Sequence, residues 1–244
     1  MPNHVLLNNV QHKDLKVITR HGAGLGDEVM FVATFPAEFR TLQAHYPIVF
    51  RKGEDGRTFE PVVLFGFQAG ENLFLKADGW DAPEIPLMIE RQPFLIGRNG
   101  EEMLVHVDLD SPRVRNAAHG ASEGEAAFLP HGGITEYLER VNSILYTIHE
   151  GFESNAGFVE ALLKYELLES FVFDIELDDG SQNRLAGFYT IHEERLHALG
   201  TEAIGALHRA GYLQAIHMVL ASLSQFRALI DRKNRQHGNH AAGR

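Results

Sequence analysis

The first half of the chain carries short apolar runs separated by turn residues, a pattern typical of β-strands. Pro36 and Pro83 each open a segment suited to a short helix, because proline fits the first helical turn. Asn99-Gly100 is the strongest hairpin signal in this half. The predicted strands are 15–20, 47–51, 58–67, 72–76, 93–97 and 102–108, and the predicted short helices are 36–45 and 83–91.

The second half changes to a helical period. From Ile134 to Phe152 apolar residues recur at intervals of three and four, which predicts a long helix that Gly151 weakens near its end. Ser154 is a suitable N-cap for a second helix. Apolar and acidic residues then alternate in a predicted hairpin at 171–191, and helices are predicted at 193–199, 201–209 and 212–235.

These patterns predict an α+β fold with a β-rich N-terminal half and a helical C-terminal half that contains one hairpin. Residues 1–114 form the β-rich half with its short helices, and 115–133 is a loop without periodicity. Residues 134–235 form the helical half, and 236–244 is a flexible tail. Because a lone hairpin needs other elements to cover it, we expect the two halves to pack as one globular unit.

Composition excludes several classes of protein. The 244 residues are 44% hydrophobic and 23% charged, as in ordinary globular proteins. The absence of cysteine excludes disulfides, cysteine-ligated zinc, iron–sulfur clusters and a thiol nucleophile. A formal net charge of −11 disfavours a nucleic-acid partner, because phosphate backbones attract basic surfaces. The start lacks a signal-peptide pattern and no apolar run reaches about 20 residues, so we expect a cytoplasmic protein without a membrane span.

Two local patterns suggest chemistry. His106 and Asp108 are alternate residues of a predicted strand and share a face, as in the first two ligands of a two-histidine, one-carboxylate iron site. With a distant histidine they would support a metal-dependent oxygenase or hydrolase; otherwise they end a strand in solvent. The loop Gly22-Ala23-Gly24-Leu25-Gly26 is similar to a dinucleotide loop, but Asp27 and Glu28 follow it and would repel phosphate. No cofactor is therefore predicted.

Known nucleophile and phosphate-loop motifs are missing from the sequence, so no catalytic residue is predicted. Aromatic, proline and glycine residues instead gather in the turns, where the single Trp80 lies between Gly79 and Asp81. An exposed aromatic there would anchor a partner, whereas a buried one would close the end of a sheet core. We predict Asn72, Trp80, Asp81 and Tyr212 as contact residues for a protein or peptide partner.

Several of these strings, in this order, resemble the SapC family of bacterial surface-layer-associated proteins. They include Tyr46-Pro47-Ile48-Val49-Phe50, Gly79-Trp80-Asp81-Ala82-Pro83, Pro93-Phe94-Leu95-Ile96-Gly97, Asp108-Leu109-Asp110-Ser111-Pro112 and Leu207-His208-Arg209-Ala210-Gly211-Tyr212-Leu213. The resemblance covers nearly the whole chain from Tyr46 to Asn234.

The resemblance implies no catalytic residues. It does imply a genomic setting, because many members of the family look like genes found beside those for flavin-dependent halogenases, cupin-like oxygenases and TonB-dependent receptors. We therefore expect a non-catalytic accessory protein that acts with a partner in uptake or modification of an envelope-related substrate. The alternatives are a metal-dependent enzyme that uses His106 and Asp108, and an exported component of a surface layer.

Overall fold

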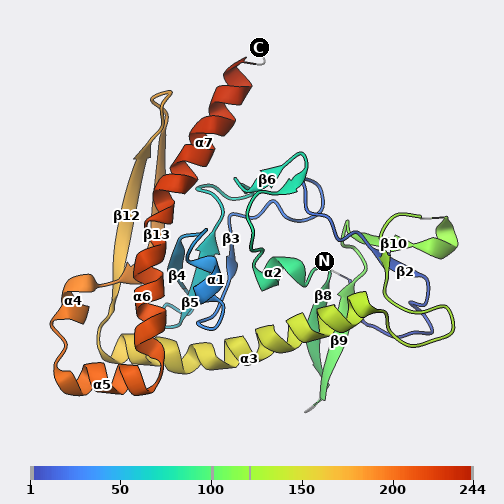
Figure 1. Cartoon of the computed structure of the whole chain (residues 1–244), viewed down its shortest axis with the longest axis horizontal. Helices are drawn as coiled ribbons and strands as arrows, with labels where there is room; N and C mark the ends of the chain where they lie inside the picture. Colours follow the sequence, from blue (N-terminus) through green and yellow to red (C-terminus); the bar gives the residue numbers. More distant parts are fainter. Residues whose placement is uncertain (1–2, 100–101, 121, 243–244) are drawn as a thin grey trace. The chain divides into compact units, whose positions relative to one another are not determined.

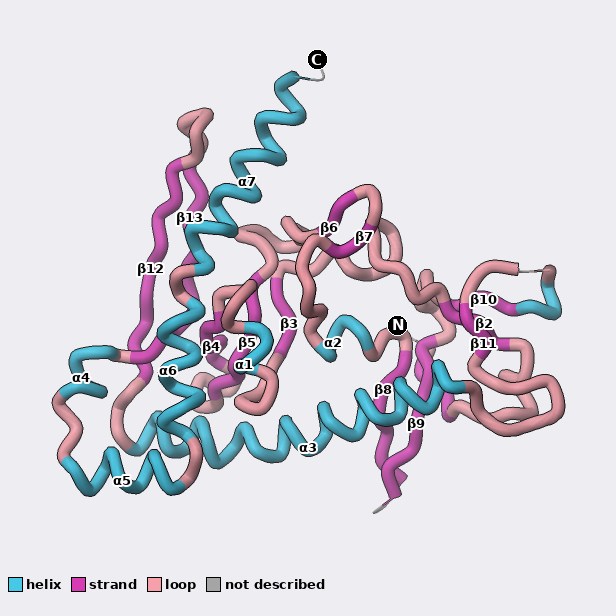
Figure 2. The backbone as a smooth tube through the Cα atoms, viewed as in Figure 1, coloured by secondary structure: helices cyan, strands magenta, loops and turns pink. Residues whose placement is uncertain are grey.

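The computed structural model describes residues 3–99, 102–120 and 122–242, and these fold as two compact units (Figures 1 and 2). Each unit is assembled from separate segments of the chain. Unit 1 contains the described residues of Met1–Glu28, Leu75–Asp81 and Leu87–Glu150, and unit 2 contains those of Val29–Phe74, Ala82–Pro86 and Gly151–Arg244. That the two sequence halves pack as one globular unit stays a prediction.

Unit 1 contains three small antiparallel sheets, ordered β1-β9-β8, β10-β2-β11 and β6-β7. Its core joins Leu15, Val17, Phe94 and Val107 from the strands to one face of a helix. The elements are β1 (His4–Leu6), β2 (Leu15–Val17), β6 (Leu75–Lys76), β7 (Gly79–Trp80), α2 (Leu87–Glu90), β8 (Phe94–Asn99), β9 (Glu102–Asp108), β10 (Val114–Asn116), the short 3-10 helix η1 (Ala117–His119), β11 (Glu125–Ala126) and the first part of α3 (Glu136–Lys164).

Unit 2 is built on one five-stranded antiparallel sheet with the order β12-β13-β4-β5-β3. Helix α6 contacts this sheet through β13 and β4. The elements are β3 (Phe31–Ala33), α1 (Phe39–Leu42), β4 (Ile48–Lys52), β5 (Phe59–Leu64), β12 (Leu168–Glu176), β13 (Gln182–Ile191), α4 (Glu193–His197), α5 (Thr201–Arg209), α6 (Tyr212–Ser222), α7 (Gln225–Ala242) and the end of α3.

The prediction of a helical C-terminal half is wrong, although the chain is α+β. The longest helix, α3, has 29 residues and lies in the middle of the sequence, and the C-terminal half supplies the two longest strands, of 9 and 10 residues. These strands join a sheet begun by β3, β4 and β5, since Phe188 pairs with Arg51 and Tyr189 with Phe50. Such long-range pairing leaves no trace in local periodicity.

Two further boundaries differ from the sequence pattern. Helix α3 continues through Gly151, because the missing side chain leaves space for the ring of Phe35, which would lie 2.3 Å from an added Cβ. Ser154 donates to the Gly151 carbonyl within this helix and does not begin a new one. Helix α7 continues to Ala242, where a flexible tail was predicted from residue 236. Gly100 of the predicted hairpin turn lies outside the described residues.

The stretch Tyr212–Gln236 is long and apolar enough to span a membrane by length and composition alone. In unit 2, however, Ile216 and Val219 of this stretch are fully buried. The Ser222 hydroxyl, also fully buried, accepts a hydrogen bond from the Ile48 N–H of β4 at 2.9 Å and donates to the Val219 carbonyl at 2.6 Å. We therefore interpret α6 as a core helix fixed to the sheet.

Replacing Ser222 with alanine should lower the free energy of unfolding by about 1–3 kcal/mol, because the buried Ile48 N–H loses its acceptor. Urea denaturation of the two proteins measures the difference. Ser224→Ala is the matched control: Ser224 is exposed and donates only to the Ala221 carbonyl, so its loss should change stability by less than about 0.5 kcal/mol. Equal effects of the two substitutions would contradict this role of Ser222.

Candidate functional site

The four predicted contact residues are divided between the two units. Trp80 and Asp81 belong to unit 1, whereas Asn72 and Tyr212 belong to unit 2. Asn72 is buried, and its side-chain Oδ1 accepts a hydrogen bond from the Phe74 N–H at 3.0 Å, which shapes a turn. The half-buried Tyr212 ring packs on Phe158 at 5.5 Å between centroids. Asp81 is exposed, 3.6 Å from the Lys76 ammonium. Contact of these residues with a partner stays a prediction.

His106 and Asp108 lie on β9, and β1 places His4 opposite Asp108 with 4.0 Å between His4 Nε2 and Asp108 Oδ2. Asp108 accepts from the N–H groups of Asn3 and Asp110, and the His106 ring covers Gly97. Among the described residues, the only group of three or more histidine and carboxylate side chains close enough to share a metal ion lies on α3, at His149, Glu150 and Glu153. The metal site at His106 and Asp108 therefore stays an untested prediction.

The most extensive polar cluster lies in unit 1, around the buried ion pair of Asp27 and Arg113. Their closest atoms are 2.5 Å apart, and both side chains are almost completely buried. Asp27 also accepts from the Gly22 N–H at 2.9 Å and lies 3.4 Å from His21 Nδ1. Arg113 donates further to the carbonyls of Ile18 and Arg20. The loop after β2 is therefore held by one guanidinium group and one carboxylate.

The Asp27 carboxylate is held in its charged form. Burial alone raises its pKa, but the hydrogen bonds from His21, the Gly22 N–H and Arg113, with the charge of Arg113, outweigh burial and hold the pKa below the usual range. Such a group neither donates nor accepts protons near neutral pH. The cluster is therefore suited to positioning its neighbours and not to acid–base catalysis.

A small cavity of about 70 Å³ lies beside this cluster. The Trp80 ring meets His21 edge-on, with 5.8 Å between centroids. Tyr137 forms part of the wall, and burial raises the pKa of its hydroxyl, so this group stays neutral. The lining residues are Thr19, His21, Glu90, Gln92, Arg113, Tyr137, Arg140, Val141 and Ile144. The space suits a few water molecules.

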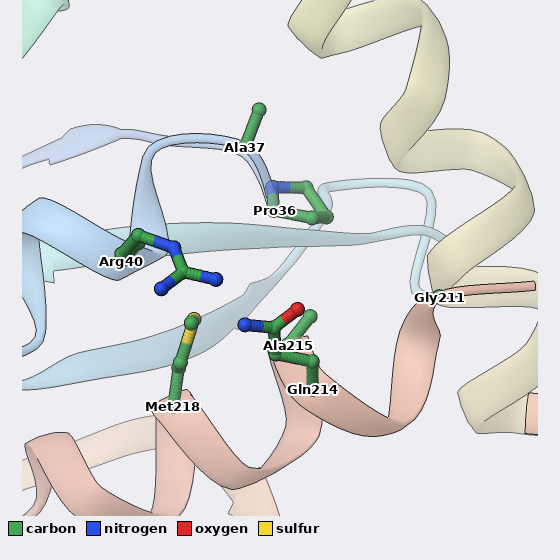
Figure 3. A pocket seen from close by; sticks show the side chains of 7 residues that line it. All are labelled: Pro36, Ala37, Arg40, Gly211, Gln214, Ala215 and Met218. Atoms are coloured by element: carbon green, nitrogen blue, oxygen red, sulfur yellow. The ribbon is translucent and has the colours of Figure 1, made fainter. Parts of the chain in front are cut away.

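Unit 2 contains a larger pocket, of about 260 Å³, between the start of α6 and the segment that leads into α1 (Figure 3). We call it the Arg40 pocket. Figure 3 shows the Arg40 guanidinium and the side chains of Gln214 and Met218 pointing toward one another. The lining residues are Pro36, Ala37, Arg40, Gly211, Gln214, Ala215 and Met218.

Two polar side chains of the Arg40 pocket have no bonding partner among the described residues. The side chains of Arg40 and Gln214 are both exposed, and within the part of the chain that the structure describes neither has a hydrogen-bond or ion-pair partner. The nearest acidic neighbour in sequence, Glu38, is buried and accepts from the Thr34 hydroxyl at 2.7 Å. A guanidinium and an amide beside apolar walls suit a carboxylate that is attached to an apolar group.

Sequence reasoning missed both of these groupings. Asp27 was interpreted only as a charge that repels phosphate, and Arg113 stands beside a turn string without any signal of burial. Arg40 and Gln214 are 174 positions apart in ordinary helical segments. The one local hint was Gly211, which gives the left-handed start of α6 and forms a wall of the Arg40 pocket.

The SapC family model matches residues 7–229, which is most of the chain. No curated protein and no solved structure matches the sequence or the fold.

Asp27→Asn should lower the free energy of unfolding by about 3–5 kcal/mol at pH 7, because it leaves the buried Arg113 charge without compensation. The folded pKa of Asp27 lies below its unfolded value of about 3.9. The stabilisation is therefore complete above that value and is lost as the pH falls through the folded pKa. The difference in free energy of unfolding between the wild-type protein and the variant should therefore become smaller below about pH 4. Urea denaturation at a series of pH values measures this difference.

Glu123→Gln is the control for this substitution. Glu123 pairs with Arg20 on the exposed surface, at 3.4 Å, and should contribute less than about 1 kcal/mol. A cost of the same size in both variants, or a gap that does not depend on pH, would show that the Asp27 charge is not what holds the loop.

Proposed function

Since the chain belongs to the SapC family, we propose that it is a non-catalytic accessory protein that binds a protein or peptide partner through the Arg40 pocket. The observation that carries this proposal is the pair of polar side chains without a bonding partner among the described residues, Arg40 and Gln214, in an otherwise apolar hollow. The ligand would be the C-terminal residue of a peptide, whose carboxylate lies on Arg40 and whose side chain contacts Pro36 and Met218.

The size and charge of the pocket support this choice of ligand. Ligand pockets for drug-sized molecules have volumes of about 300–1,000 Å³, so about 260 Å³ suits one amino-acid residue. A guanidinium group binds a carboxylate through two parallel hydrogen bonds, which also fixes its orientation. The Gln214 amide can donate a third hydrogen bond.

The composition of the pocket supports binding without catalysis. Its lining contains one cation, one amide, a thioether and small or apolar residues. A hydrolase or transferase needs a nucleophile, or a general acid and base, in reach of the substrate. None of the seven lining residues supplies one of these groups.

The setting of this binding rests on the family resemblance. The resemblance implies a gene that lies beside genes for flavin-dependent halogenases, cupin-like oxygenases and TonB-dependent receptors. We accordingly propose a cytoplasmic role beside a system that takes up or modifies an envelope-related substrate. The partner of the accessory protein would be a component of that system with an accessible C-terminus.

Affinity selection with two synthetic octapeptide pools tests the binding. One pool has free C-terminal carboxylates and the other is the same pool with amidated C-termini. The immobilised wild-type protein should retain the carboxylate pool preferentially, and Arg40→Gln should reduce that retention about tenfold or more, because a hydrogen bond to a charged group is worth about 1.5–3 kcal/mol. Quantitative mass spectrometry of the eluted peptides measures both.

Arg57→Gln is the matched control, since Arg57 is an exposed arginine in the turn between β4 and β5 of the same unit. It should leave retention unchanged. Equal retention of the two pools, or equal losses in the two variants, would overturn the proposal. Stoichiometric iron, manganese or zinc in untagged protein that disappears on His106→Ala would favour the metal-enzyme alternative, and a signal confined to the cell surface on fractionation would favour the surface-layer alternative.

A further inference from the structure

Strand β12 is an unpaired edge of the sheet of unit 2. It pairs along its length with β13 on one side, and among the described residues no strand lies on its other side. No loop or helix of the described chain forms a backbone hydrogen bond with residues 168–176 there either. In an antiparallel pair, alternate residues direct their N–H and C=O groups away from the partner strand. The outer side of β12 therefore presents a row of backbone donors and acceptors to solvent.

The length of this edge is what sets it apart. β12 has nine residues, whereas the opposite edge, β3, has three. Figure 1 shows the β12–β13 hairpin continuing past the ends of β4 and β5, with α7 beside it. Phe226 of α7 contacts the rings of Phe171 and Phe173, which fixes one face of the strand. Val172 on the other face is 51% exposed.

An acidic pocket lies at the end of the β12–β13 hairpin. A pocket of about 480 Å³ is lined by Asp174, Ile175, Glu176, Gln182, Asn183 and Arg184. From 168 to 191 the hairpin carries the acidic residues Glu169, Asp174, Glu176, Asp178 and Asp179 against a single cation, Arg184. The ion pair of Arg184 with Asp174 is exposed and spans 3.6 Å, so it neutralises little of this charge.

We propose that the outer edge of β12 binds an extended segment of a partner protein that carries lysine or arginine at alternate positions. The segment adds a sixth strand to the sheet, and its backbone bonds to the unpaired groups of β12. Its basic side chains on the solvent face lie beside Asp174 and Glu176 and enter the acidic pocket. This surface is separate from the Arg40 pocket and does not depend on the function proposed for it.

Charge selects this occupant over a second copy of the chain. Antiparallel pairing of two β12 strands would gather Asp174 and Glu176 of both copies on one exposed face, directly opposite one another in the register that sets position 174 against 176, and like charges on neighbouring strands destabilise a pair. The same carboxylates attract a basic strand. They therefore disfavour edge-to-edge self-association while they leave the edge open to a partner of the opposite charge.

The test uses an octapeptide of alternating valine and lysine with both ends blocked, so that it has no carboxylate for the Arg40 pocket. Fluorescence anisotropy should show binding to the wild-type protein, whereas the valine–glutamate analogue should not bind. A valine–lysine peptide with methyl groups on alternate backbone nitrogens keeps its charge but cannot form the strand ladder, and should not bind. Hydrogen exchange should slow at the outward amides of 168–176 when the unmodified peptide is present.

Protein variants test the charge. The double substitution Asp174→Asn with Glu176→Gln should weaken binding about fivefold, because each exposed charge pair contributes modestly. The matched control, Glu160→Gln on α3 with Glu202→Gln on α5, removes two exposed charges outside the hairpin in the same unit and should have no effect. Equal binding of the methylated peptide, equal losses in both double variants, or a dimer through β12 in the protein alone would overturn the proposal.

Discussion

The buried ion pair of Asp27 and Arg113 is the constraint on which the loops of unit 1 depend. Two charges taken out of water are costly unless every remaining donor and acceptor has a partner. Arg113 meets most of that requirement by reaching the carbonyls of Ile18 and Arg20 as well as Asp27, although its buried Nε has no partner in the described chain. Satisfying one side chain therefore fixes the path of the chain after β2, on which the positions of His21 and Trp80 depend.

Structural clusters and candidate binding sites in this molecule differ in whether their polar groups have partners within the protein. Unit 2 contains a second nearly buried ion pair, between Glu71 and Lys233, which ties α7 to the loop after β5. Like the Asp27 cluster, its charges face one another and offer little to a ligand. Arg40 differs from Arg113 and Lys233 in this respect, because its charge has no internal partner in the described residues. The Arg40 guanidinium is exposed and is therefore open to an incoming anion.

The sequence predicted the features that depend on neighbouring residues. Alternation identified the hairpin at 171–191, and the three-and-four spacing identified the first two-thirds of α3. It failed where a distant residue decides the outcome. Gly151 was interpreted as a weak point of a helix. Its actual role, leaving space for the Phe35 ring, depends on a contact between residues 116 positions apart, which the local sequence does not show. The pairing of β13 with β4 is equally distant, and it places strands of the C-terminal half, which was predicted to be helical, in a sheet with strands of the N-terminal half.

The candidate site escaped prediction for a related reason. A search for exposed aromatic anchors assumes that the aromatic residues in turns are available, but most of them here pack on one another. The rings of Tyr46, Phe65 and Phe74 form one such group, and Trp80 packs on His21. Because these rings are packed in the core, partner binding depends on two other kinds of group. These are polar side chains without a partner in the protein and backbone groups at an unpaired sheet edge. Arg40 and the outer edge of β12 are of these two kinds, and neither has a local sequence signal.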